Sequence, residues 1–305
     1  MMPDLSVEIA GIRMRNPVMT ASGTFGYGPE YADLVDLNEL GAVVVKGICL
    51  NPTKGNPTPR TAETASGLLN AIGLPGPGVE GFVRDYMPFL RRYDVPVIVN
   101  IWGKTVEEYA EVAARLDRVP GIAGLEVNVS CPNIKEGSAM FGTDLLMFER
   151  VVTAIRAATK LPLIPKLAPN VADIGEFARC AEASGADAIS LINSFPGMAV
   201  DIRTRGFKLA NKTGGLTGPA IKPIALRLVW LAAKAVRIPV IGMGGIVTAQ
   251  DALEFMMVGA RAVAVGTATF VNPDTAIQVI QGIRDFFVEQ GIRTVYEWVG
   301  SLRDE

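Results

Sequence analysis

A cysteine flanked by two carboxamide side chains lies within residues 128–133, which read Asn-Val-Ser-Cys-Pro-Asn. The largely apolar run 122–127 precedes this hexapeptide, so Cys131 is expected just beyond the end of a strand. The chain contains no histidine, so proton transfer must fall to a thiol, a carboxylate, a lysine or a hydroxyl. Pro132 disfavours helical geometry at the preceding residue. Cys131 is therefore the best-placed candidate for a catalytic base.

The other two cysteines are expected to be inert. Cys180 lies inside a helical run and Cys49 follows a predicted strand, and buried thiols commonly serve as small apolar side chains. The three cysteines lie far apart and show no CxxC spacing, which predicts no zinc, iron–sulphur or other metal site in this chain. Free thiols favour a reducing, cytoplasmic location.

Composition limits the classes of protein to consider. A chain of 305 residues with 49 % apolar residues could form one large α/β barrel or two smaller domains. The net charge of −2 gives no electrostatic reason to expect nucleic acid or a membrane surface as a partner. Residues 1–17 resemble neither a signal peptide nor an amphipathic anchor, and no apolar run approaches the length of a membrane span.

Short β-branched runs alternate with longer stretches of helical period along the chain. Strands are predicted at 17–21, 42–46, 95–101, 124–130, 163–167, 188–193, 239–243 and 262–266. Most are near-continuous apolar runs, a pattern typical of parallel strands covered on both faces. Helix starts are indicated at Thr105, Thr143-Asp144 and Thr248. Eight strand–helix units, closed by a helix over 274–290, predict one (β/α)8 TIM barrel over residues 1–305.

A doubly wound sheet is the alternative fold. It would need a glycine-rich turn after the first strand, and residues 21–26 (Ala-Ser-Gly-Thr-Phe-Gly) match that pattern only loosely. The barrel is the favoured fold.

Two connections, 49–78 and 194–218, are too long to be simple turns, and we expect both long loops to cover the C-terminal mouth of the barrel.

Polar residues stand at the ends of the predicted strands. They are Ser22, Lys46, Asn100, Asn128 with Cys131, Lys166, Asn193 with Ser194, Gly244-Gly245 and Gly266-Thr267. A single such residue would be a structural cap, but so many at equivalent positions indicate one binding site.

Glycine-rich turns follow the last two strands, where barrel loops often bind phosphate through backbone N–H groups. Gly244, Gly245, Gly266 and Thr267 are thus candidates for a phosphate site, although tight loop geometry alone would also explain them. Asn70 in the first long loop adds a carboxamide, and several carboxamides could bind the N–H and C=O edge of a pyrimidine-like or flavin-like ring.

These motifs resemble the dihydroorotate dehydrogenase family over essentially the whole chain. They are Ala21-Ser22-Gly23, Gly55-Asn-Pro-Thr-Pro-Arg60, Asn70-Ala-Ile-Gly-Leu74, Asn128-Val-Ser-Cys-Pro-Asn133, the stretch 214–223, Gly242-Met-Gly-Gly-Ile246 and Val265-Gly-Thr267. A cysteine rather than a serine at 131 is similar to the soluble class 1 members. The stretches 61–67 and 215–218 are most similar to the catalytic subunit of the NAD-linked class 1B. Trp102 is a departure, because the resemblance leads us to expect a smaller residue there.

The resemblance implies an FMN-dependent oxidation of (S)-dihydroorotate to orotate in pyrimidine biosynthesis. Cys131 would remove the C5 proton while hydride passes from C6 to the flavin. The implied substrate contacts are Lys46, Asn70, Ala71, Ile72, Gly73, Leu74, Asn128, Asn193 and Ser194. The implied FMN contacts are Ser22, Lys46, Gly47, Asn100, Asn128, Lys166, Ile192, Gly218, Gly244, Gly245, Gly266 and Thr267. Lys166 would stabilise the negative charge of the reduced flavin.

The resemblance also implies partners. It leads us to expect a homodimer joined to a subunit that carries FAD and an iron–sulphur cluster, since this chain has no dinucleotide motif. Three alternatives remain open at this point. They are a fumarate-linked homodimeric dihydroorotate dehydrogenase, another FMN barrel such as a dihydropyrimidine-type reductase, and a Schiff-base lyase using Lys166. A non-catalytic binding barrel is disfavoured by the number of polar strand ends.

Overall fold

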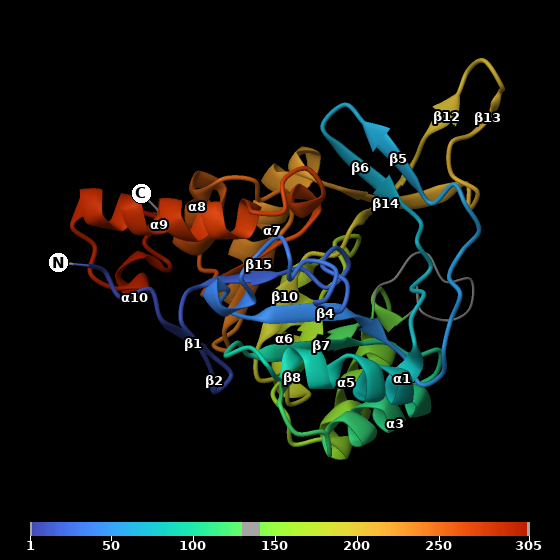
Figure 1. Cartoon of the computed structure of the whole chain (residues 1–305), viewed down its shortest axis with the longest axis horizontal. Helices are drawn as coiled ribbons and strands as arrows, with labels where there is room; N and C mark the ends of the chain where they lie inside the picture. Colours follow the sequence, from blue (N-terminus) through green and yellow to red (C-terminus); the bar gives the residue numbers. More distant parts are fainter. Residues whose placement is uncertain (1, 130–140, 304–305) are drawn as a thin grey trace.

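Eight parallel strands form the centre of the computed structural model, which describes residues 2–129 and 141–303 (Figure 1). In chain order they are β3 (Val18–Thr20), β4 (Val43–Ile48), β7 (Val97–Ile101), β8 (Ile122–Asn128), β9 (Leu163–Lys166), β10 (Ile189–Leu191), β15 (Val240–Met243) and β16 (Ala262–Val265). From β4 to β16 each pairs with the next, and β16 pairs in parallel with β3. All eight predicted strands are confirmed, with ends that differ by a few residues.

The sheet closes into a barrel at the seam between β3 and β4. An isolated parallel bridge joins Met19 to Ala42. The buried Thr20 hydroxyl donates to the Val44 carbonyl oxygen (3.2 Å) and accepts from the Val44 N–H (2.8 Å). The Thr20 side chain thus supplements the backbone hydrogen bonds that cross the seam, and the fold is the predicted (β/α)8 barrel.

Helices cover the outside of the barrel. They are α1 (Gly78–Asp85), α2 (Met87–Leu90), α3 (Val106–Leu116), α5 (Leu145–Ala158), α6 (Ile174–Ala183), α7 (Lys222–Ala235), α8 (Ala249–Met257) and α9 (Thr275–Gln290). The predicted helix starts are confirmed: Thr105 and Asp144 accept N-cap hydrogen bonds, and Thr248 forms a capping box with Asp251.

The first strand–helix unit departs from the prediction of eight regular units. Between β3 and β4 the chain forms turns and the 3-10 helix η1 (Leu37–Glu39), with no α-helix. Gly26 and Gly28 both have positive φ and Pro29 follows them, so this segment cannot continue as a helix.

The two long connections form a shared antiparallel sheet rather than two separate loops. The order is β11 (Phe195–Met198), β14 (Thr213–Thr217), β6 (Gly67–Asn70) and β5 (Thr61–Thr64). Figure 1 shows this sheet beside the barrel, and we call it the roof sheet. The short hairpin of β12 (Val200–Asp201) and β13 (Gly206–Phe207) projects beyond it.

The N-terminal segment forms the hairpin of β1 (Val7–Ile9) and β2 (Ile12–Met14). Ile12 Cδ1 packs close to Gly124, near the start of β8, and Met14 Cε packs close to Gly41, just before β4. The hairpin therefore lies at the amino ends of the strands. Short elements η2 (Pro219–Ile221), η3 (Thr267–Phe270) and α10 (Val295–Trp298) complete the fold. Across residues 2–129 and 141–303, no helix combines the length and the apolar character that a bilayer crossing requires.

Candidate active site

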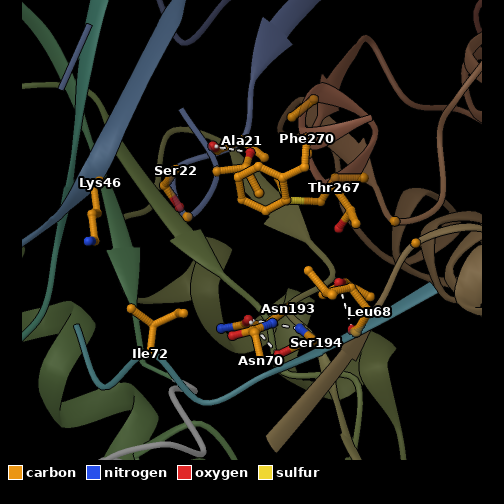
Figure 2. A pocket seen from close by; sticks show the side chains of 18 of the residues that line it. Ala21, Ser22, Lys46, Leu68, Asn70, Ile72, Asn193, Ser194, Thr267 and Phe270 are labelled. Carbon is orange, nitrogen blue, oxygen red and sulfur yellow. Dashed lines mark hydrogen bonds between the residues drawn. The ribbon is translucent and has the colours of Figure 1, made fainter. Parts of the chain in front are cut away.

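A cavity of about 460 Å³ lies at the carboxyl ends of the barrel strands, next to the roof sheet. Its walls come from barrel strands, from the roof strands β5, β6 and β14, and from the turns after β15 and β16. Figure 2 shows Lys46, Asn70, Asn193 and Thr267 arranged around this space. The volume falls within the roughly 300–1,000 Å³ of ligand-sized pockets.

Most residues singled out in the sequence line this one cavity. They are Ser22, Lys46, Gly47, Asn70, Ile72, Gly73, Leu74, Asn100, Asn128, Lys166, Ile192, Asn193, Ser194, Gly218, Gly244, Gly245, Gly266 and Thr267. Ala71 is different, because its side chain is buried with Leu69 and Leu209 in a small separate cluster instead of lining the cavity. Cys131 lies outside the residues that the structure describes.

Three carboxamides cluster on one side of the cavity. Asn193 Nδ2 donates to Asn128 Oδ1 (3.1 Å), and the Ser194 N–H donates to Asn193 Oδ1 (2.8 Å). Asn70 Nδ2 donates to the carbonyl oxygen of Gly215 in the roof sheet (3.2 Å). Figure 2 shows Asn70, Asn193 and Ser194 together. Residues distant in the sequence thus form one cluster of amide donors and acceptors beside the cavity.

Lys46 reaches the cavity from strand β4 (Figure 2). Burial lowers the pKa of its ammonium, and the carboxylate of Glu30, which also lines the cavity, partly opposes this shift. An anionic ligand bound here would relieve the cost of burying this cation.

A buried ion pair lies at the base of the cavity. Lys166 Nζ is 3.7 Å from Glu126 Oε2 and 3.5 Å from Ser22 Oγ. Asn100 Nδ2 donates to Glu126 Oε2 (2.6 Å) and Ser190 Oγ donates to Glu126 Oε1 (3.0 Å). The sequence reading missed Glu126, although a carboxylate inside a largely apolar strand was a visible signal.

Glycine turns form another part of the cavity wall. Gly244 and Gly245 have φ of +123° and +80°. A Cβ on Gly245 would lie 2.8 Å from Lys222 Cβ and 2.9 Å from the Gly218 carbonyl oxygen, and a Cβ on Gly244 would lie 2.8 Å from Ala225 Cβ. Only glycine therefore allows this turn, which brings bare backbone to the cavity wall.

Trp102 does not intrude on the cavity. Its side chain is 3 % exposed and belongs to the barrel core. Trp102 Cδ1 would lie 3.1 Å from a Cβ on Gly47, so the indole packs behind Gly47, a cavity residue. The large side chain of Trp102 is thus accommodated in the barrel core and takes no space from the cavity.

Several cavity residues were not expected from the sequence. They are Thr24, Glu30, Tyr31, Thr61, Thr217 and Phe270, among others. Thr61 and Thr217 belong to the roof sheet. Thr61 lies opposite Asn70 in the β5–β6 hairpin, whereas Thr217 lies opposite Leu68 through the long-range pairing of β14 with β6. Phe270, in η3 at the rim, is 55 % exposed.

A closed parallel barrel, with a cavity at the carboxyl ends of its strands where lysines and carboxamides stand among apolar side chains, defines a (β/α)8-barrel enzyme. The family model for dihydroorotate dehydrogenase matches residues 4–287. The chain therefore belongs to the dihydroorotate dehydrogenase family, whose members are oxidoreductases.

Curated relatives match the chain from end to end. A protein of Geotalea uraniireducens is 56 % identical over 300 residues, which cover 98 % of each chain. A protein of Geotalea daltonii is 55 % identical over 301 residues, with 99 % of each chain covered. One of Geobacter sulfurreducens is 56 % identical over 301 residues, with 98 % of each covered. All three are named dihydroorotate dehydrogenase B (NAD(+)), catalytic subunit.

Proposed function

We propose that this chain oxidises (S)-dihydroorotate to orotate with FMN bound in the barrel cavity, as the catalytic subunit of an NAD-linked enzyme of pyrimidine biosynthesis. The observation that carries the proposal is that a carboxamide cluster, the two lysines Lys46 and Lys166, and the Gly244-Gly245 turn all line one cavity. The family and the names of the relatives supply the reaction. The whole chain, 1–305, would act as one FMN-binding barrel domain.

The carboxamide side of the cavity suits the pyrimidine ring. Asn70, Asn128 and Asn193 carry both donors and acceptors, which the alternating N–H and C=O groups of dihydroorotate require. Ser194 and the backbone at Gly73 and Leu74 would complete this subsite. Lys46 would pair with the substrate carboxylate, which offsets the cost of its burial.

The remaining walls suit FMN. The Gly244-Gly245 turn and Gly266-Thr267 would take the phosphate through backbone N–H groups, because only glycine lets the chain turn at 244–245 while packed against Ala225 and Lys222. Ser22, Gly47, Asn100, Lys166, Ile192 and Gly218 would line the ring. When bound, FMN supplies the acceptor for the hydride that leaves C6 of the substrate.

Formation of orotate also requires loss of the proton at C5. Cys131 would take it as the general base, a role that rests on the family resemblance and on the absence of histidine. Asn128, at the end of β8, would contact the substrate ring.

Electrons would leave through a second protein. The relatives are named catalytic subunits of an NAD-linked enzyme, which implies another subunit. We infer a homodimer of this chain in a heterotetramer with a subunit that carries FAD and an iron–sulphur cluster, acting in the cytoplasm.

The fumarate-linked enzyme and the dihydropyrimidine-type reductase are less well supported, because the curated relatives carry the NAD-linked name. The family match disfavours the lyase.

Two glycine variants test the cofactor site. Gly245→Ala places a methyl group against Lys222 and Gly218, so we expect the FMN dissociation constant to rise by about tenfold or more, equivalent to about 1.4 kcal/mol. Gly291→Ala is the matched control, since Gly291 also has positive φ (+69°) but ends α9 with nothing within 4 Å of its Cβ position. It should cost about 1–2 kcal/mol of stability, because an L-residue is strained in the left-handed conformation, and leave FMN affinity unchanged. Equal FMN affinity in the two variants would count against the proposed phosphate site.

A further inference from the structure

A carboxylate lies buried directly beneath the cavity without lining it. Glu126 is 3 % exposed and is absent from the cavity wall, whereas its partners Asn100 and Lys166 do line the cavity. Both Glu126 oxygens are engaged: Oε2 by Asn100 Nδ2 (2.6 Å) and Lys166 Nζ (3.7 Å), and Oε1 by Ser190 Oγ (3.0 Å). Glu126 thus contacts the cavity only through other side chains.

The barrel register explains why these groups meet. Asn100 on β7 lies opposite Glu126 on β8, and Ser190 on β10 lies opposite Lys166 on β9. Glu126 and Asn128 are two residues apart, so both face the barrel interior, with Glu126 one layer deeper. Four consecutive strands therefore bring Lys166, Asn100 and Ser190 around the buried carboxylate of Glu126.

Stability alone does not account for this arrangement. Removing two charges from water costs several kcal/mol per ion, and apolar side chains of similar volume are often as stable as a buried ion pair. What the pair does provide is a fixed orientation of the side chains that line the cavity. Lys166 and Asn100 both reach the cavity, and both contact the carboxylate of Glu126, which does not reach it.

We propose that Glu126 is a positioning residue that holds Lys166 and Asn100 at the floor of the cavity and balances the Lys166 charge there. The assignment rests on the proposed function, since the ligand above this floor would be the FMN ring. Its effect on the cofactor is exerted through Lys166.

A double-mutant cycle on unfolding of the FMN-free full chain tests the pairing. The variants are Glu126→Gln, Lys166→Met and the double variant. With Lys166 present, Glu126→Gln leaves an unpaired buried cation, so the melting temperature should fall. In the Lys166→Met background, the same change removes an unpaired buried carboxylate, so the melting temperature should rise or stay the same. An equal fall in both backgrounds would overturn the proposal.

The reduction potential of bound FMN tests the effect on the cofactor. With Lys166 present, Glu126→Gln leaves the Lys166 charge unbalanced at the floor of the proposed FMN site, so the potential should become more positive. In the Lys166→Met background no ammonium remains for Glu126 to hold or balance, so the same change should shift the potential by less. No shift, a negative shift, or equal shifts in the two backgrounds would contradict the proposed role.

Two further variants separate positioning from packing. Ser190→Ala removes a buried hydrogen bond to the same carboxylate but no charge, so it should lower the melting temperature and leave the potential unchanged. Glu126→Asp keeps the charge. Its FMN potential should therefore lie closer to that of the unmodified chain than the potential of Glu126→Gln does. Equal potentials in Glu126→Asp and Glu126→Gln would contradict the charge-balancing role.

If the chain binds no FMN, the proposed function fails, and the unfolding cycle still decides whether Glu126 and Lys166 act as a pair.

Discussion

Single side chains in this barrel owe their properties to burial, and Cys49 is a clear example. Its side chain is 5 % exposed, and its Sγ donates to the Asn51 carbonyl oxygen (3.0 Å). Burial raises the pKa of the Cys49 thiol to about 11. Cys180 is half-buried, and burial raises the pKa of its thiol too. Both environments fit the expectation of inert thiols.

The raised pKa of Cys49 has a consequence for stability against pH. Because the folded-state pKa lies above the unfolded value near 9, the neutral thiol stabilises the native state below pH 9, and this contribution is lost as the pH rises through about 11. We expect the free energy of unfolding to fall more steeply between pH 9 and 11 for the unmodified chain than for Cys49→Ala. Denaturant titrations at several pH values measure both curves. Parallel curves would show that Cys49 does not titrate as its burial requires.

Cys131 is expected to behave in the opposite way, as a functional thiol. Cys131→Ala should reduce turnover by at least about a thousandfold while FMN stays bound, because the base contacts the substrate and not the phosphate turns. Cys131→Ser should keep weak activity that rises at high pH, since an alkoxide is far harder to form than a thiolate. Steady-state assays with an artificial acceptor measure both. Near-normal rates in Cys131→Ala would remove Cys131 from the mechanism.

At the scale of elements, local patterns predicted the barrel but not the roof sheet. Most barrel strands are near-continuous apolar runs, so the local pattern located all eight. It also located polar residues at their ends, such as Asn128, Lys166 and Asn193. The roof sheet pairs Asn70 with Gly215 across 145 residues of chain, and no local pattern signals such a pairing. Glu126 was missed for a different reason, because it was read as part of an apolar run.

The roof sheet leads to a prediction of its own. A Cβ on Gly215 would overlap Ser194 Oγ and lie 2.5 Å from Ser194 Cβ. Gly215→Ala should therefore displace Ser194 and raise the KM for dihydroorotate by about tenfold, with FMN affinity little changed. Gly206→Ala is the control, because its Cβ position meets only the Thr204 hydroxyl (3.3 Å) in the projecting hairpin. A KM that is the same in both variants would show that the roof does not shape the substrate subsite.

At the scale of the whole molecule, the proposed function divides the reaction between two proteins. The isolated chain should pass electrons from dihydroorotate to a small dye, since that step needs only the cavity described above. It should reduce NAD only after the FAD and iron–sulphur subunit is added, with a gain of at least about a hundredfold. Parallel assays with dye, NAD and fumarate measure this. Robust NAD reduction by the chain alone would refute the partner model, and efficient fumarate reduction would indicate the homodimeric class.

Anaerobic titration of the FMN-loaded chain with dihydroorotate tests the central claim most directly. We predict that the purified or reconstituted protein is yellow, and that dihydroorotate bleaches the visible flavin absorbance while one orotate forms per FMN. Gly291→Ala should behave in the same way. A chain that cannot be loaded with FMN, or one whose bound FMN stays oxidised in excess dihydroorotate, would contradict the account.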